Sequence, residues 1–265
     1  MSVLAVTTQS ASPARSTATR FGALLRGEFV KLTSTRTAGW LVLSAASLSA
    51  LAVSGVVAGG VAQDALATET GLRTVLAHGG LAAILPLVLG VLVSAGEYRH
   101  GTVVDTLLTE PRRSWVVGTK LVLGAVVGLI TGLLDVVVTA GTAAAWYASK
   151  GVALDLASAA SLQTMAGVVV WTILYGVSGV ALGSIIRTPP AAIVAVVVWL
   201  FVAETAVARL LVDVGRWLPG TAASALGNTP LDGALSQVGG GAVLLGWTGL
   251  AAAGAFWATG RRDVT

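Results

Sequence analysis

Three ionisable side chains lie inside long apolar stretches of this 265-residue chain: His78, Asp135 and Glu204. An ionisable group within a membrane is energetically costly, so each is a candidate functional group by default. Together they could form a polar layer that closes a gate or contacts a cationic cargo. The alternative is structural: Glu204 reaches the membrane interface near Arg209, and Asp135 is protonated or hydrogen-bonded to a neighbouring helix.

A second pattern could supply a nucleophilic serine, because residues 176–179 have the sequence G-V-S-G. This matches the G-x-S-G motif of rhomboid intramembrane proteases, in which a histidine from a later span activates the serine. The only histidines are His78 and His100, and neither follows Ser178. Because the activating base is missing, we expect Ser178 to be a small packing residue.

The residues that several other kinds of catalytic or binding site require are absent from the sequence. The chain has no cysteine, which excludes a disulfide framework, a thiolate nucleophile and a thiolate metal site. A phosphate-binding P-loop needs G-x-x-x-x-G-K-[ST], and none of the lysines at positions 31, 120 and 150 follows a glycine. We therefore expect no enzyme activity in this chain and no catalytic, cofactor or metal site of its own.

The composition is that of a membrane protein. Hydrophobic residues make up 55% of the chain and charged residues 11%, whereas soluble domains carry about 25% charged residues. About 20 apolar residues cross a bilayer as a helix. The sequence therefore predicts an all-α polytopic membrane protein with six transmembrane helices, at approximately residues 40–61, 75–94, 121–144, 164–186, 191–211 and 240–258.

The distribution of basic residues predicts the orientation. Cytoplasmic flanks hold an excess of Lys and Arg, and with both termini in the cytoplasm only four of the 16 basic residues lie outside: Arg73, Lys150, Arg209 and Arg216. The net charge of +4 then reflects orientation, with acidic lipid headgroups and not nucleic acid as the partner. Residues 1–19 are expected to form a disordered cytoplasmic tail. The bias to Ala, Val, Gly and Arg indicates a GC-rich bacterium, and hence the plasma membrane.

Two cytoplasmic segments are amphipathic. Residues 20–32 place apolar side chains at helical spacing, which is typical of a helix lying among lipid headgroups; the alternative is an ordinary basic flank that serves only topology. In the loop between the second and third spans, residues 103–108 have apolar side chains at helical spacing, and Pro111 ends the helix. This short rod could dock a partner.

These segments resemble the permease subunits of type-2 ABC transporters, a six-helix family that includes exporters of drugs, ions and polysaccharides. The resemblance covers about residues 21–262. Its most specific part is a loop pattern formed by Glu97, Gly101, Thr102, Leu107, Pro111, Arg113 and Lys120. Further support comes from Glu28, Lys31, Ser34, Arg36 and Trp40 around the start of the first span, and from Trp199 and Glu204 in the fifth.

The resemblance implies roles for these segments within a single permease domain, residues 20–262. Residues 20–34 would be an elbow helix, with Phe21, Glu28, Lys31 and Arg36. The loop 95–117 would carry a coupling helix that sits in a groove of a cytoplasmic ATPase. Its coupling residues would be Glu97, Arg99, Gly101, Thr102, Leu107, Glu110, Pro111 and Arg113. Residues 211–238 would form short re-entrant helices on the outer side.

The function that the resemblance implies is that of a permease subunit in an ATP-driven exporter of drug-like, lipid-like or other amphipathic compounds. Six spans are half of the usual twelve-helix pathway. A second permease copy or a homologue is therefore expected, together with two ATPase subunits that hold ATP and Mg. The alternative is an ATP-independent secondary carrier or a membrane scaffold. A carrier would favour broken helices, ion ligands near the midplane and inverted repeats, and we find no convincing repeat.

The third span carries a row of glycines at Gly124, Gly128 and Gly132. Small residues four apart let helices approach closely in lipid. We expect this row to pack within the chain, with a dimer seam or a sliding surface as the alternative. The same span stays apolar over residues 115–147, which is longer than a bilayer needs, so it should tilt or protrude.

Overall fold

The structure, a computed structural model, describes residues 17–59 and 62–261, which form helices and connecting turns with no β-strand among them. Six helical segments are long and apolar enough to cross a membrane, which confirms the six predicted stretches. They are α2 (Arg36–Ala58), α4, η1 and α5 together (Glu69–His100), α7 (Arg113–Lys150), α8 (Ala159–Ile186), α9, η2 and α10 together (Pro189–Leu210), and α13 (Gln237–Arg261).

Local sequence signals set several of the helix ends. Helices α5 and α7 each end at a glycine in the left-handed conformation, Gly101 with φ 71° and Gly151 with φ 66°, where a residue with a side chain would be strained. Helix α9 (Pro189–Val198) begins with two prolines, which lack the backbone N–H that the first turn of a helix does not need. The sharp break between the fourth and fifth spans follows from this pair.

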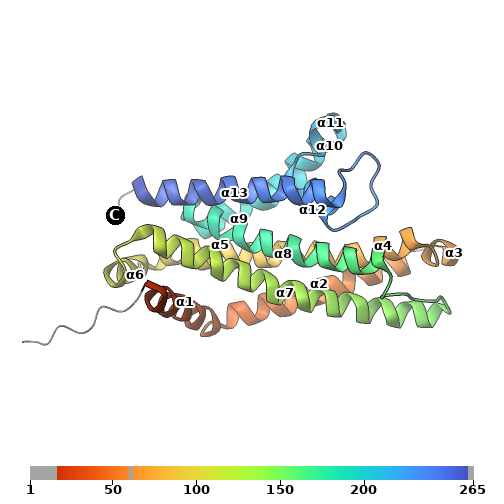
Figure 1. Ribbon diagram of the computed structural model, residues 1–265, viewed down its shortest axis with the longest axis horizontal. Coiled ribbons are helices and arrows are strands. Elements are labelled where there is room, and N and C mark those ends of the chain that lie inside the picture. The colour runs from red at the N-terminus through yellow and green to blue at the C-terminus, as the bar shows by residue number, and fades with distance from the viewer. Residues whose placement is uncertain (1–16, 60–61, 262–265) are drawn as a thin grey trace, which may run out of the picture.

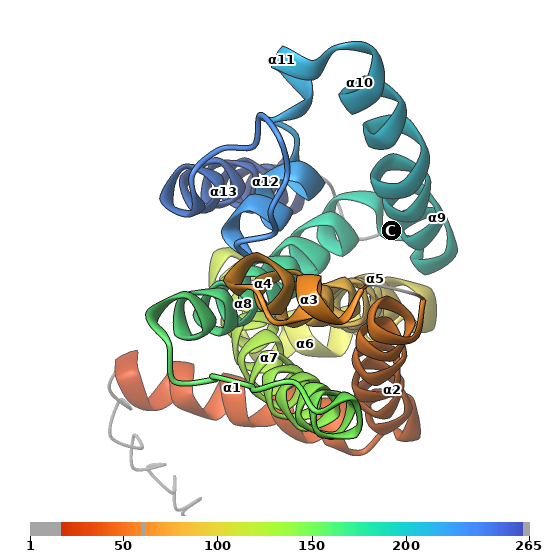
Figure 2. The same cartoon turned by 90° about the vertical axis from the view of Figure 1, so that its right-hand side faces the viewer.

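Helix α8 lies at the centre of the bundle and packs against α5 (Ile84–His100), α7 and α13 (Figures 1 and 2). The glycine row of α7 faces α8. A Cβ atom added at Gly124 would lie 2.7 Å from the carbonyl oxygen of Gly176, and one at Gly128 would lie 2.5 Å from that of Thr172. The row therefore packs within the chain, as expected, and α8 covers the face that a dimer seam would need.

Helix α7 is the longest element. Its 38 residues correspond to about 57 Å at 1.5 Å per residue, against a hydrocarbon core of about 30 Å. The helix must therefore tilt or extend beyond the bilayer, as its long apolar run predicts.

Two of the six segments are not continuous α-helices. The second contains a 3₁₀ segment, η1 (His78–Ala83), between α4 (Glu69–Ala77) and α5, and the fifth contains a π segment, η2 (Trp199–Ala203), between α9 and α10 (Glu204–Leu210). In η1, Gly79 fits against the side chain of Thr139 and Gly80 against Trp171, with no space for a Cβ atom. Irregular turns of this kind occur often at functional sites.

Short helices flank the ends of the bundle. Helix α1 (Thr17–Thr33) crosses one end, where α6 (Val103–Thr109) and the last turn of α13 also lie, and α3 (Gln63–Leu66) is at the opposite end (Figures 1 and 2). Helices α11 (Val212–Gly215) and α12 (Pro219–Leu226) occupy the segment expected to hold short re-entrant helices. The expected tail lies outside the described residues except for 17–19, which belong to α1.

Candidate functional site

Four charged side chains from three helices meet where α1 crosses the bundle. Lys31 Nζ lies 2.7 Å from Glu28 Oε1 and 2.8 Å from Glu97 Oε1. Lys120 Nζ lies 2.6 Å from Glu28 Oε2 and 2.9 Å from Glu97 Oε1. Glu28 and Lys31 come from α1, Glu97 from the end of α5 and Lys120 from the start of α7. We call these four residues the charge junction.

Most of the charge junction is withdrawn from water. The exposed fraction of the side chain is 6% for Lys120, 8% for Glu28 and 9% for Glu97, whereas Lys31 is half exposed at 50%. Buried charges persist only when they are paired and hydrogen-bonded. Because two carboxylates face two ammonium groups, the junction is balanced, and loss of one partner would leave an uncompensated charge.

The pKa values of two junction residues move in the directions that favour ionisation. Burial alone would raise the pKa of Glu28, but the charges and hydrogen bonds of Lys120 and Lys31 outweigh it and hold the pKa below its ordinary value. Burial alone would lower the pKa of Lys31, but hydrogen bonds to Glu28 and Glu97 raise it above its ordinary value. Both residues are therefore charged at neutral pH.

Helix α6 is attached to this junction. Lys31 Nζ donates a hydrogen bond of 3.1 Å to Thr106 Oγ1 in the middle of α6. Val103 at the start of α6 is buried at 7% exposure, whereas Val104 and Leu108 are 47% and 77% exposed. One side of α6 is thus fixed to the chain, and Val104 and Leu108 lie on its exposed side together with Asp105.

The structure brings together three of the residues selected from the sequence, Glu28, Lys31 and Glu97, and separates others. Glu110 accepts a local hydrogen bond of 3.2 Å from the N–H of Arg112. Arg113 donates a hydrogen bond of 3.1 Å to the carbonyl oxygen of Thr259, at the end of α13.

The remaining loop and α1 residues lie around the junction. Phe21 packs edge-to-face on Trp115 at 6.3 Å between ring centroids, and Arg36 is exposed. Arg99, Gly101 and Thr102 line two cavities beside the end of α5, while Leu107 is half-buried and Pro111 lies between α6 and α7.

Two members of the site were not given a role from the sequence. Lys120 was part of the motif pattern, and an isolated lysine beside a long apolar run is a signal that it needs an acidic partner. Thr106 has no such signal, because threonine is common on helix surfaces.

The three ionisable groups selected from the apolar stretches, His78, Asp135 and Glu204, have separate partners. Asp135 is fully buried, and its Oδ1 accepts a hydrogen bond of 3.0 Å from Ser49 Oγ. Glu204 Oε1 accepts one of 2.7 Å from the N–H of Thr221, and His78 Nδ1 lies 2.6 Å from the carbonyl oxygen of Thr74. No hydrogen bond or ion pair among the described residues joins the three to one another.

Ser178, the serine of the G-x-S-G pattern, lies where α8 meets α13. Its Oγ is 3.0 Å from Thr248 Oγ1. The contact ties two helices together.

No protein-family model matches this chain, and no curated protein matches it in sequence. The class of the protein therefore has to be inferred from its structure. The described residues form a helical protein with six helices that are long and apolar enough to cross a membrane. Its distinguishing feature is a buried charge junction that connects α1, α5 and α7 and bonds to α6.

Proposed function

We propose that this chain is the permease subunit of an ATP-driven exporter of the type-2 ABC class, working in the plasma membrane with a separate cytoplasmic ATPase. The observation that carries the proposal is the connection of α6 to the charge junction. A partner that pushes on α6 would act on Lys31 through Thr106, and thereby on Glu97 in α5 and Lys120 in α7.

The junction suits transmission because its geometry is specified by four ion pairs. Ion pairs in a desolvated setting are costly to separate, so α1, α5 and α7 should shift together when one of them is displaced. In this proposal α1 is the elbow helix and α6 the coupling helix, and both lie on the cytoplasmic side with the two termini. Closure of the ATPase around ATP and Mg would supply the force.

The outward face of α6 is the proposed docking surface for the ATPase. Val104 and Leu108 are exposed there, and an exposed apolar pair on a short helix fits a groove on a partner. Two ATPase subunits and a second permease copy or homologue would complete the exporter, with a twelve-helix pathway for an amphipathic substrate.

Affinity purification from the native host tests the proposal. The tagged wild-type chain, extracted in mild detergent, is expected to recover a P-loop ATPase that mass spectrometry identifies. Leu108→Asp should lose the ATPase, because a charge on the docking surface would be desolvated on binding. Val238→Asp is the matched control, since Val238 is 82% exposed in the first turn of α13, at the opposite end of the bundle from α6. Recovery of no ATPase by the wild type, or equal recovery by both variants, would contradict the proposal.

A second candidate, an ATP-independent carrier, is favoured by one observation: the spans that contain η1 and η2 are interrupted. Carriers commonly bind their substrate at broken helices. The two candidates differ in their energy source. Transport into proteoliposomes that follows an imposed ion gradient, with the chain alone and without ATP, would support the carrier and remove the need for a partner ATPase.

A further inference from the structure

A cavity of about 490 Å³ adjoins Glu204 in the fifth span. Its lining comes from five parts of the chain: the 3₁₀ segment η1 with the start of α5, the middle of α8, the π segment η2 with α10, α12, and Leu231 in the loop after α12. Both irregular segments of the spans therefore border the same space. None of the groups in the charge junction lines it.

Glu204 is the acidic group of this cavity and is only 3% exposed. Its Oε1 accepts the hydrogen bond from the N–H of Thr221 in the first turn of α12. Gly220 allows this approach, because a Cβ atom there would lie 2.9 Å from Oε1. The second oxygen, Oε2, is buried and has no hydrogen-bond partner among the described residues. The capping of α12 thus uses one carboxylate oxygen and leaves the other without a hydrogen-bond partner among the described residues.

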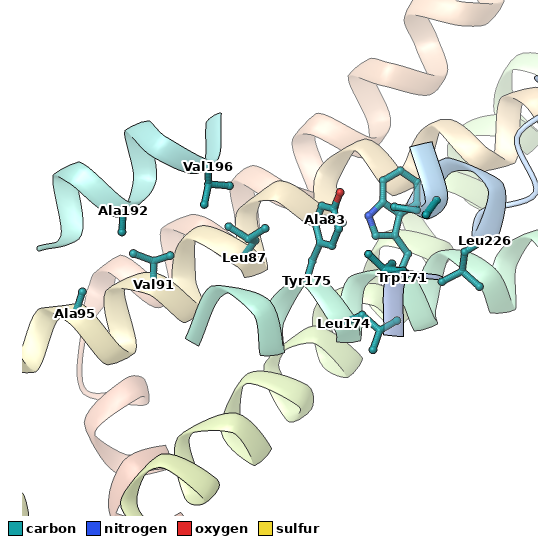
Figure 3. Close-up of a cluster of buried hydrophobic side chains, with 13 residues drawn as sticks. Ala83, Leu87, Val91, Ala95, Trp171, Leu174, Tyr175, Ala192, Val196 and Leu226 are labelled. Atoms are coloured by element: carbon teal, nitrogen blue, oxygen red, sulfur yellow. The ribbon is translucent and has the colours of Figure 1, made fainter. Parts of the chain in front are cut away.

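The walls beside Glu204 are aromatic. Trp171 and Tyr175 project from α8 and pack edge-to-face with 5.8 Å between their ring centroids, next to Ala83 and Leu87 (Figure 3). Phe201 of η2 also lines the cavity, and it is 58% exposed. A buried carboxylate beside several aromatic rings attracts organic cations, since both the negative charge and the faces of the rings favour a positive centre.

A calcium or magnesium ion fits this space poorly. Calcium takes six to eight oxygen ligands and magnesium needs about six, in near-octahedral order. No group of three or more acidic or histidine side chains that could hold a metal occurs in the described part of the chain. The exposed guanidinium of Arg209 also lines the cavity, and it disfavours a ligand with a second positive charge.

We propose that this cavity binds a monovalent, aromatic organic cation, with the positive centre near the Glu204 carboxylate and the apolar part against Trp171, Tyr175 and Phe201. That such a compound is the transported substrate rests on the proposed exporter function. The binding itself does not, because every residue of the cavity belongs to this chain.

Binding of tetraphenylphosphonium to the purified full-length chain in lipid nanodiscs tests the proposal. The wild type should bind the radiolabelled cation saturably, and Glu204→Gln should weaken binding by about tenfold or more because the Coulomb attraction of the carboxylate is lost. The glutamine keeps an oxygen that can accept the Thr221 N–H. Asp135→Asn, which neutralises a buried acid that does not line this cavity, should bind like the wild type. Tetraphenylborate, an anion of the same shape, should bind Glu204→Gln at least as well as the wild type, because the variant removes a negative charge that repels it.

Equal binding by the wild type and Glu204→Gln, or an equal loss in Asp135→Asn, would overturn the proposal. If Glu204→Gln does not fold, Phe201→Ala replaces it, since this exposed side chain is not needed to cap α12. Phe201→Ala should weaken binding of the cation several-fold while the melting temperature of the chain stays unchanged. Unchanged binding would contradict the proposed contact between the cation and the aromatic side chains. If the chain binds the cation but no ATPase copurifies with it, the exporter function is contradicted and this inference stands. If an ATPase copurifies but binding does not depend on Glu204, this inference is contradicted and the exporter function stands.

Discussion

The charge junction and the two buried acids of the spans show opposite ways of keeping carboxylates out of water. At the junction, Glu28 and Glu97 face two lysines, and the charges balance. Asp135 and Glu204 have no cation within ion-pair distance among the described residues. Each has one oxygen without a hydrogen-bond partner, as Glu97 has, but Glu97 is paired with two lysines. The difference indicates that the junction holds helices together, whereas an unpaired acid is open to a proton or a ligand.

The largest effect is expected from Lys120→Met, which leaves two buried carboxylates with one lysine. Removing one partner of a buried ion pair costs about 3–5 kcal/mol of folding free energy. Denaturant or thermal unfolding in detergent measures this loss. Adding Glu28→Gln to the same chain should restore a large part of it, because the double variant again balances one carboxylate with one lysine. Additive losses in the double variant would show that the two residues are independent.

A smaller loss is expected from Lys31→Met, because Lys31 is half exposed and water screens its ion pairs. Exposed pairs contribute about 0.2–1 kcal/mol, and the hydrogen bond to Thr106 is lost as well. The variant should therefore fold and keep a melting temperature close to that of the wild type. A loss of folding free energy as large as that of Lys120→Met would mean that the ion pairs of Lys31 are not screened by water.

The pH dependence of unfolding distinguishes the contribution of Glu28 from that of Lys31, because the two residues titrate at opposite ends of the pH range. Glu28 has a pKa below its ordinary value of 4.5 when folded, so its contribution is complete above 4.5 and is lost as the pH falls through the folded pKa. Lys31 has a pKa above its ordinary value of 10.5, so its contribution is complete below 10.5 and is lost as the pH rises through the folded pKa. The melting temperature should therefore fall less at acidic pH in Glu28→Gln than in the wild type. An equal fall in both would rule out Glu28 as the source of the loss of stability in acid.

The smallest effect is expected from Asp135→Asn. The asparagine oxygen can still accept the hydrogen bond from Ser49, and no lysine or arginine is left without a partner. Stability should change by less than about 1 kcal/mol, and transport should persist if Asp135 is structural. Loss of transport in a stably folded Asp135→Asn chain would instead assign this carboxylate to the gate or the substrate path.

The spans and the two flanking helices could be predicted because each depends on local sequence. An apolar run of about 20 residues is sufficient to identify a span, and the spacing of apolar residues around Phe29 and Leu107 is sufficient for an amphipathic helix. The turns in η1 and η2 could not be predicted, because their apolar composition equals that of a regular span. The glycine pair at Gly79 and Gly80 marks η1 only once Thr139 and Trp171 are seen beside it.

The charge junction shows where prediction from one sequence ends. Lys120 and Glu28 are 92 residues apart, and composition and periodicity do not specify which distant charges will pair. The motif pattern identified three of its four members as site residues, but not that they touch. The hydrogen bond between Glu204 and Thr221 could not be predicted for the same reason. Thr221 belongs to another helix, α12, and only the fold places it beside Glu204.

The central claim is that a P-loop ATPase acts on this chain through α6 and the charge junction. Hydrogen–deuterium exchange of the purified complex, with and without ATP and vanadate, tests it most directly. We expect nucleotide-dependent protection in α6 that extends to α1 and the start of α7 in the wild type, and that stays within α6 in Lys31→Met. Protection that leaves residues 103–109 unchanged, or the same extended pattern in Lys31→Met, would contradict the account.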